Sequence, residues 1–126
     1  KIFCFATDDA HNIGEHDLGG FIMVKTKEFT HMGNLEAIKD GSFYASSGPL
    51  LHDFYVEDGV AHVTCEPCQH IYFQTPHRGD CLFSEEGDCL TEGSFVLNGD
   101  EECVRVTIKN SRGQKAWTQP IWLWLF

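Results

Sequence analysis

The stretch LHDFYVEDGVAHVTC, residues 51–65, decides the fold class of this chain. Its first half alternates around Phe54 and Val56, and its second half returns with two apolar valines, Val60 and Val63, and with the polar residues His62 and Thr64 interspersed. Such alternation is typical of strands that bury one face. The dipeptide Asp58-Gly59 between the halves favours a two-residue turn, because both central positions of that turn need a positive φ. The stretch therefore predicts an antiparallel β-hairpin.

The rest of residues 49–126 repeats this pattern. Cys103–Lys109 alternates most clearly, with two valines and an isoleucine facing one way. Further strands are expected at Gln69–Gln74, Ser94–Leu97, Lys115–Thr118 and Ile121–Leu125. Asp80–Gly93 is polar and is expected to form a long connection. About seven short strands joined by turns are typical of an immunoglobulin-like sandwich, so we expect a mainly β fold, an antiparallel β-sandwich.

Residues 1–48 have the pattern of a short α/β segment. Two apolar runs are expected to form strands, namely Ile2–Ala6 and Phe21–Val24. Residues 31–39 carry apolar side chains at helical spacing, with Thr30 placed as the N-cap and Gly41 as the C-cap. Ser46–Pro49 indicates a turn or linker. We therefore predict a domain boundary, with an α/β segment at 1–48 and a β-sandwich at 49–126.

The C-terminal end is strongly apolar. If the strand Ile121–Leu125 is regular, Trp122, Trp124 and Phe126 share one of its faces. Both faces are apolar, and such strands are more often buried than exposed. We expect these residues to lie in the core or against a neighbour, in preference to forming a platform for a ligand.

The length and charge of the chain exclude several functions. Its 126 residues suffice for one domain, whereas a complete (β/α)8 barrel takes roughly 200 or more. With 19 acidic and 9 basic residues the net charge is -10, which disfavours nucleic acids and anionic membranes as partners. Acidic turns such as Asp100-Glu101-Glu102 are interpreted as solubilising. The chain has no signal peptide and no apolar run of about 18 residues, so we expect a cytoplasmic location.

Six cysteines leave three alternatives open. Cys65 and Cys68 form a CxxC motif, which occurs in zinc knuckles and in redox motifs. Cys81 and Cys89 could complete a four-thiolate zinc site, although their spacing is wider than that of a second knuckle. Disulfides and free, partly buried thiols are the other two possibilities, and free thiols are favoured in a reducing cytosol.

The cluster Asp8-Asp9-Ala10-His11 follows the first predicted strand. A strand that ends in Asp-x-His places a carboxylate and an imidazole at one strand end. These are side chains that bind divalent transition metals, so Asp9 and His11 are candidate metal ligands.

Three segments give the chain a resemblance to a known family. They are Ala6–His11, Gly19–Val24 and Leu35–Pro49, the last containing the sequence GSFYASSGP. Together they resemble the C-terminal end of a PHP-domain phosphoesterase, of the polymerase and histidinol phosphatase family. Arg105–Ile108 and Ala116–Ile121 are similar to the accessory region that follows the barrel in some members.

The resemblance implies a specific function for the protein from which this chain comes. Members fold as a distorted (β/α)7 barrel, which binds two or three Zn, Mn or Fe ions and hydrolyses phosphate esters. Asp9 and His11 would be the last metal ligands, whereas Asp8 would not bind the metal and would either support one of the ligands or be structural. The family also needs an N-terminal His-x-His motif, which this chain lacks. We therefore expect a fragment whose partner is the missing N-terminal barrel. Alone it should be inactive, with no stable metal.

Two other functions compete with this one. The chain could be a stand-alone β-sandwich that binds carbohydrate or protein, which exposed aromatic residues at loop tips would favour. It could also be a small zinc-stabilised domain built on the four cysteines of residues 65–89.

Overall fold

We analysed a computed structural model of the chain, which describes residues 2–9, 11–12, 14 and 19–125. In chain order the elements are β1 (Phe21–Val24), α1 (His31–Asp40), β2 (Phe43–Ser46), β3 (Leu51–Glu57), β4 (Val60–Cys68), β5 (His70–Gln74), β6 (Gly79–Phe83), β7 (Leu90–Val96), β8 (Cys103–Lys109), β9 (Lys115–Trp117), β10 (Ile121–Trp122) and a 3-10 helix (Leu123–Leu125).

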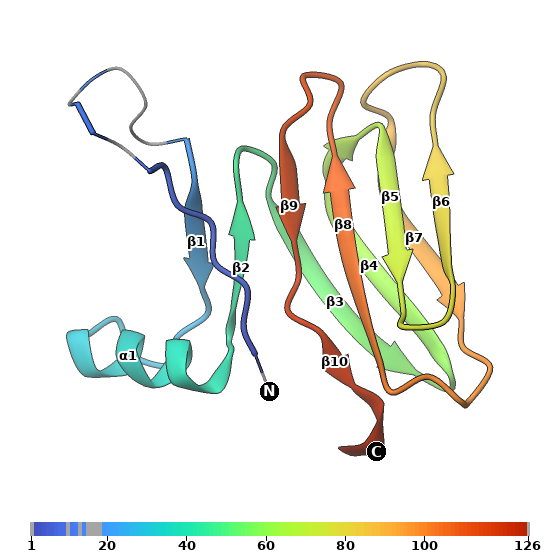
Figure 1. Cartoon of the computed structure of the whole chain (residues 1–126), viewed down its shortest axis with the longest axis horizontal. Helices are drawn as coiled ribbons and strands as arrows, with labels where there is room; N and C mark the ends of the chain where they lie inside the picture. Colours follow the sequence, from blue (N-terminus) through green and yellow to red (C-terminus); the bar gives the residue numbers. More distant parts are fainter. Residues whose placement is uncertain (1, 10, 13, 15–18, 126) are drawn as a thin grey trace.

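The strands form two antiparallel sheets that pack face to face (Figure 1). The larger sheet has the order β1-β2-β9-β8-β5-β6, with β10 also paired to β8, and the smaller sheet has the order β3-β4-β7. Between them lies one apolar core, in which the Phe73 and Phe95 rings stack across the sheets with centroids 5.5 Å apart. The expected mainly β class is therefore confirmed.

Local sequence signals explain the best-predicted elements. Asp58 and Gly59 both have positive φ, as the tight turn between β3 and β4 requires. Thr30 accepts a hydrogen bond from the Gly33 N–H at the start of α1. Gly41 ends the helix with a φ of 78°. On β8, Val104, Val106 and Ile108 all point into the core.

The prediction of a long connection at Asp80–Gly93 was wrong. This range contains most of β6 and the start of β7. Strand β6 lies at the edge of the larger sheet and pairs only with β5. Most side chains of β6 face solvent, and Leu82 is partly buried. Because so few of its side chains are buried, this edge strand has a polar sequence that resembles that of a loop.

The expected strand at Ile2–Ala6 is also absent from the structure. Residues 2–9 have no regular secondary structure. The Cys4 N–H donates to Gln119 Oε1, and Gln119 Nε2 donates to the Cys4 carbonyl, both at 2.8 Å. The side-chain amide thus takes the place of a neighbouring strand and satisfies this part of the backbone.

The tail does not continue as a regular strand. Strand β10 ends at Trp122, and the 3-10 helix follows at once. The alternation expected for Trp122 and Trp124 is therefore wrong, although their rings still touch with centroids 4.6 Å apart. Trp124 is 60% exposed, so it does not lie in the core of this chain, and its expected contact with a neighbour stays a prediction. Phe126 lies outside the described residues.

The larger sheet extends across the predicted boundary between residues 1–48 and 49–126. Strand β2 pairs with β9, with Ala45 opposite Trp117 and Ser46 opposite Ala116. Strand β1 extends the same sheet by pairing with β2. The division into a barrel remnant and a sandwich stays a prediction.

Candidate functional site

Asp9 and His11 are exposed and precede β1 in the chain. Asp9 has a φ of 53°, a left-handed conformation that aspartate tolerates better than most residues. His11 Nδ1 lies 2.7 Å from the Asp9 carbonyl oxygen. A carbonyl only accepts hydrogen bonds, so Nδ1 carries a proton and, in the neutral ring, Nε2 holds the free lone pair. The bond thus sets which nitrogen of His11 can bind a metal.

Asp8 ties this segment to the beginning of β1. Its carboxylate accepts a hydrogen bond from the Gly20 N–H. Gly20 also lies close to the Thr7 backbone, where a Cβ at Gly20 would come within 2.8 Å of the Thr7 carbonyl oxygen. Asp8 thus contacts the start of β1, and its role beside a metal stays a prediction.

The other candidate metal ligands are not gathered around Asp9 and His11. Within the part of the chain that the structure describes, no three His, Cys, Asp or Glu side chains are grouped as a metal site would require. Cys65 and Cys68 are buried together, whereas Cys81 and Cys89 are exposed. The four thiolates proposed for a zinc site are therefore not brought together.

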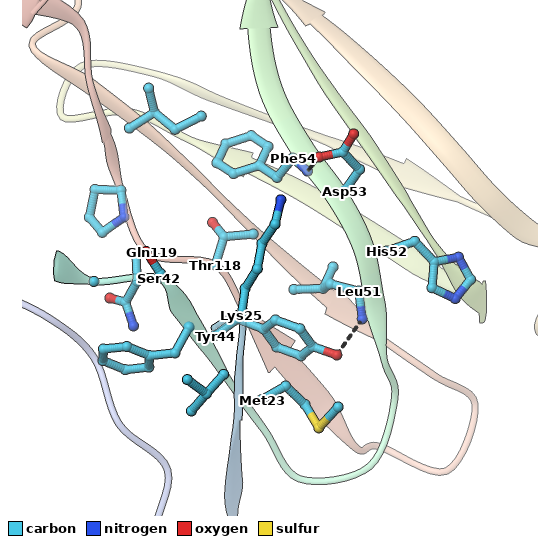
Figure 2. A pocket seen from close by; sticks show the side chains of 15 residues that line it. Met23, Lys25, Ser42, Tyr44, Leu51, His52, Asp53, Phe54, Thr118 and Gln119 are labelled. Carbon is cyan, nitrogen blue, oxygen red and sulfur yellow. Dashed lines mark hydrogen bonds between the residues drawn. The ribbon is translucent and has the colours of Figure 1, made fainter. Parts of the chain in front are cut away.

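A cavity of about 580 Å³ lies where the first strands meet β3 (Figure 2). Its polar lining includes Lys25, His52, Asp53 and Gln119, and its apolar lining includes Phe54. In Figure 2 the Lys25 side chain extends into the space between the strands. The size and mixed lining are those of a pocket for a small molecule.

Tyr44 forms one wall of this cavity. Its hydroxyl accepts a hydrogen bond of 3.1 Å from the Leu51 N–H, which holds the start of β3 against β2 (Figure 2). Burial raises the pKa of Tyr44 above its usual value, an effect that the Leu51 bond partly offsets. The hydroxyl therefore stays neutral and keeps its wall of the cavity in place.

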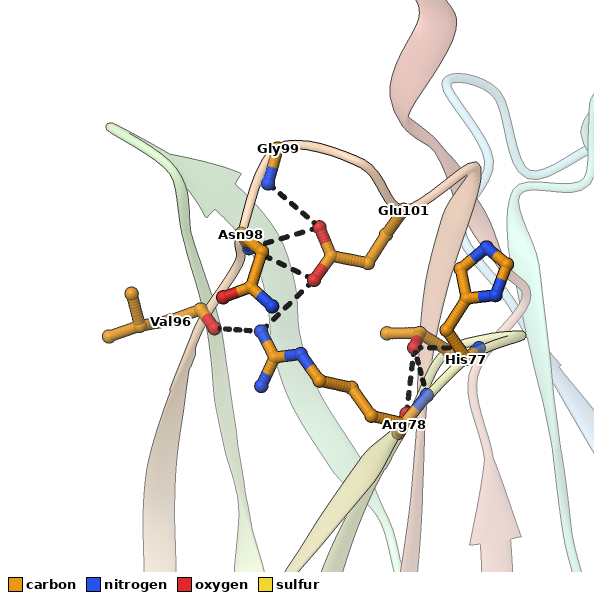
Figure 3. A network of polar contacts seen from close by, with 7 residues as sticks. His77, Arg78, Val96, Asn98, Gly99 and Glu101 are labelled. Carbon is orange, nitrogen blue, oxygen red and sulfur yellow. Dashed lines mark hydrogen bonds and ion pairs between the residues drawn. The ribbon is translucent and has the colours of Figure 1, made fainter.

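A polar network joins the loop before β6 to the loop before β8 (Figure 3). The Glu101 carboxylate accepts hydrogen bonds from the Asn98 and Gly99 N–H groups and from Arg78 Nη2. Arg78 also donates to the Val96 carbonyl and stacks over Phe95, with 4.3 Å from its guanidinium carbon to the ring centroid. Burial tends to raise the pKa of Glu101, but these donors outweigh it and hold the pKa at about 2.

Nothing in the sequence distinguishes Glu101 from the acidic residues beside it. Its neighbours Asp100 and Glu102 are exposed, and all three acids were interpreted as solubilising. The Glu101 side chain has no exposed area, so that interpretation is wrong for this residue. Asn98-Gly99 in LNGDEE indicates a turn, but not that the turn surrounds a carboxylate.

Comparisons with known proteins add no identification. No family model, no curated protein and no solved structure matches the chain. Among the described residues, no helix has the length and apolar character needed to cross a membrane.

Proposed function

We propose that this chain is the C-terminal part of a metal-dependent PHP-family phosphoesterase. In the intact protein Asp9 and His11 would bind one of its divalent ions, Zn, Mn or Fe. The two sheets would form an accessory region beside the barrel, and the substrate would be a phosphate ester.

The observation that carries the proposal is the bond between His11 Nδ1 and the Asp9 carbonyl. Histidine ligands commonly donate one ring N–H to a carbonyl or carboxylate, which orients the other nitrogen toward the metal. Both side chains are exposed, so neither is held in a core. A carboxylate and an imidazole nitrogen two residues apart fit the donor chemistry of Zn, Mn and Fe.

The distribution of exposed apolar side chains supports a missing neighbour. Ten large hydrophobic residues are exposed among those described, and six of them lie between residues 2 and 35. These six are Ile2, Phe5, Met23, Phe29, Met32 and Leu35. Helix α1 buries Ala37 and leaves Met32 62% exposed. A preceding barrel that packs on residues 2–35 would cover this surface.

The residues of this chain would have limited roles in the reaction. Bound divalent ions would supply the positive charge that offsets a phosphate and acidifies water. Asp9 and His11 would hold one such ion. Asp8, through the Gly20 N–H, would keep their segment fixed relative to β1. Because two ligands cannot hold a catalytic metal cluster, the chain of 126 residues should have no phosphatase turnover of its own.

The test uses the reading frame that contains residues 1–126 together with the residues encoded before it. Hydrolysis of p-nitrophenyl phosphate and of its bis-ester is measured with Mn²⁺ or Zn²⁺ supplied. Asp9→Asn and His11→Gln should each lower the rate by roughly 100-fold. Asp100→Asn and His77→Gln replace exposed residues of the same types and should leave it unchanged.

Three results would contradict the proposal. One is an open reading frame with no barrel-sized stretch before Lys1. The second is full activity in the Asp9 and His11 variants. The third is robust phosphatase turnover by the chain of 126 residues alone.

The cavity in Figure 2 favours a second candidate, a β-sandwich that binds a small molecule. The Lys25 amine suits a carboxylate or phosphate on that molecule, and Phe54 offers an apolar contact. A screen of small sugar acids and sugar phosphates by thermal shift would test this function. Binding that is lost in Lys25→Met and kept in Lys27→Met, a neighbour outside the cavity lining, would support it.

A further inference from the structure

Cys65 and Cys68 place their sulfur atoms 3.8 Å apart inside the sandwich. The two residues are 3% and 0% exposed. All six cysteines of the chain are described, and this is the one pair whose sulfurs are within hydrogen-bonding distance. A disulfide needs sulfurs about 2.05 Å apart, so a movement of less than 2 Å would join them.

A bulge in β4 makes this contact possible. In a regular strand, residues three apart point to opposite faces. Here Thr64 pairs with Glu92 and Cys68 pairs with Leu90, so four steps along β4 match two along β7. The extra residues turn both cysteines toward the core. Pro67 lies within the bulge, where its missing N–H costs no ladder bond.

The environment gives the two sulfurs different acidities. The Cys68 thiol donates to the His70 carbonyl, with 3.4 Å from its Sγ to the oxygen. The contact with Cys65, together with burial, raises the pKa of Cys68, whereas the contact with Cys68 lowers the pKa of Cys65. Because the Cys68 proton is held by the His70 carbonyl, Cys65 is the better nucleophile of the pair.

We infer that Cys65 and Cys68 are a reversible oxidation site, which forms an intrachain disulfide with a small peroxide as oxidant. The inference is independent of the proposed phosphoesterase function. Hydrogen peroxide fits this site because it is small and uncharged and can reach buried sulfurs that a bulky disulfide cannot.

The chemistry balances in two steps. The Cys65 thiolate attacks one peroxide oxygen, the O–O bond breaks, and the released hydroxide takes up a proton to give water. Cys68 sulfur then attacks the resulting Cys65 sulfenic acid. The S–S bond forms, and the Cys68 proton leaves with the hydroxyl group as a second water. Two molecules of a small thiol, such as glutathione, reverse the oxidation and are themselves joined in a disulfide.

Peptide mapping tests this site cleanly. Residues 40–78 contain no lysine or arginine before Arg78, so trypsin cleavage after Lys39 and Arg78 isolates Cys65 and Cys68 as the only cysteines of one peptide. The reduced chain is treated with hydrogen peroxide and then alkylated in denaturant. We expect peptide 40–78 to lack two hydrogen atoms and to escape alkylation. Prior treatment with dithiothreitol should restore full alkylation of both residues.

Variants and a control for a bound metal test whether Cys65 and Cys68 form the disulfide. Cys65→Ser and Cys68→Ser should each abolish the oxidised peptide, and Cys81→Ser and Cys89→Ser should keep it. The inference is overturned if Cys65 and Cys68 stay alkylatable at peroxide doses that oxidise the exposed Cys81 and Cys89. It is also overturned if they escape alkylation without peroxide until a chelator is added, which would indicate a bound metal. The wild-type mapping decides the matter even if a variant fails to fold.

Discussion

Arg78 Nη2 lies 3.0 Å from Glu101 Oε1, and this ion pair joins the loop before β6 to the loop before β8 (Figure 3). The Glu101 side chain is fully buried, whereas that of Arg78 is 35% exposed. A buried carboxylate that is satisfied by several donors becomes costly when its charge or its partners are removed. The pair is therefore expected to matter for stability.

Replacing Glu101 should destabilise the fold. Glu101→Gln removes the charge and presents an NH₂ group to backbone N–H donors that need an acceptor. We expect the free energy of unfolding to fall by about 2 kcal/mol. Glu102→Gln is the matched control, because Glu102 is exposed and pairs only with the exposed His77; it should change stability by less than about 0.5 kcal/mol. Urea denaturation measures both, and equal losses would contradict the role given to Glu101.

The same carboxylate predicts a pH dependence. The pKa of Glu101 is about 2 in the folded chain and lies near 4.5 without these contacts. A depressed pKa stabilises the fold above the unfolded value, and this stabilisation is lost as the pH falls from about 4.5 toward 2. The urea midpoint of the wild-type chain should therefore fall more steeply over that range than the midpoint of Glu101→Gln. Parallel curves would indicate that Glu101 does not titrate in this way.

Gly41 offers a test of how residues 2–9 dock. Gly41 and Gly113 both have positive φ, 78° and 83°. A Cβ at Gly113 would meet nothing within 4 Å, whereas one at Gly41 would overlap the Phe3 ring. Gly113→Ala should cost about 1 to 2 kcal/mol from the backbone alone. Gly41→Ala should cost more, and Phe3→Ala in the Gly41→Ala background should recover part of the excess. Equal losses for both single variants would mean that Phe3 does not pack on the helix end.

Sequence signals predicted those elements whose causes are local. The turn at Asp58-Gly59, the caps of α1 and the buried face of β8 each depend on residues within a few positions. The errors arose where a distant partner decides the structure. Cys4 obtains its backbone hydrogen bonds from Gln119, 115 positions away, and β6 forms by pairing with β5 and by packing Leu82 against the core.

The same difference between local and distant causes applies to the candidate site. Asp9 and His11 could be singled out because they are sequence neighbours, and their contact is local. The burial of Glu101 could not be predicted, because it depends on how the loop after β7 folds around the carboxylate. The contact between Cys65 and Cys68 could not be predicted either, because it depends on the bulge in β4. That further ligands complete a metal centre around Asp9 and His11 stays a prediction.

The exposed apolar residues of 2–35 predict that the isolated chain associates with itself. Phe29 is 95% exposed and Met32 is 62% exposed, and monomeric proteins rarely leave a large apolar surface uncovered. Sedimentation velocity should show larger species as the concentration of the chain rises. The double variant Phe29→Ser and Met32→Gln should shift the distribution toward the monomer. Val96→Thr, which replaces a 67% exposed residue on β7, should leave it unchanged. If Val96→Thr shifts the distribution and the double variant does not, the surface that mediates self-association lies on the smaller sheet. That result would remove one support for a barrel packed on residues 2–35.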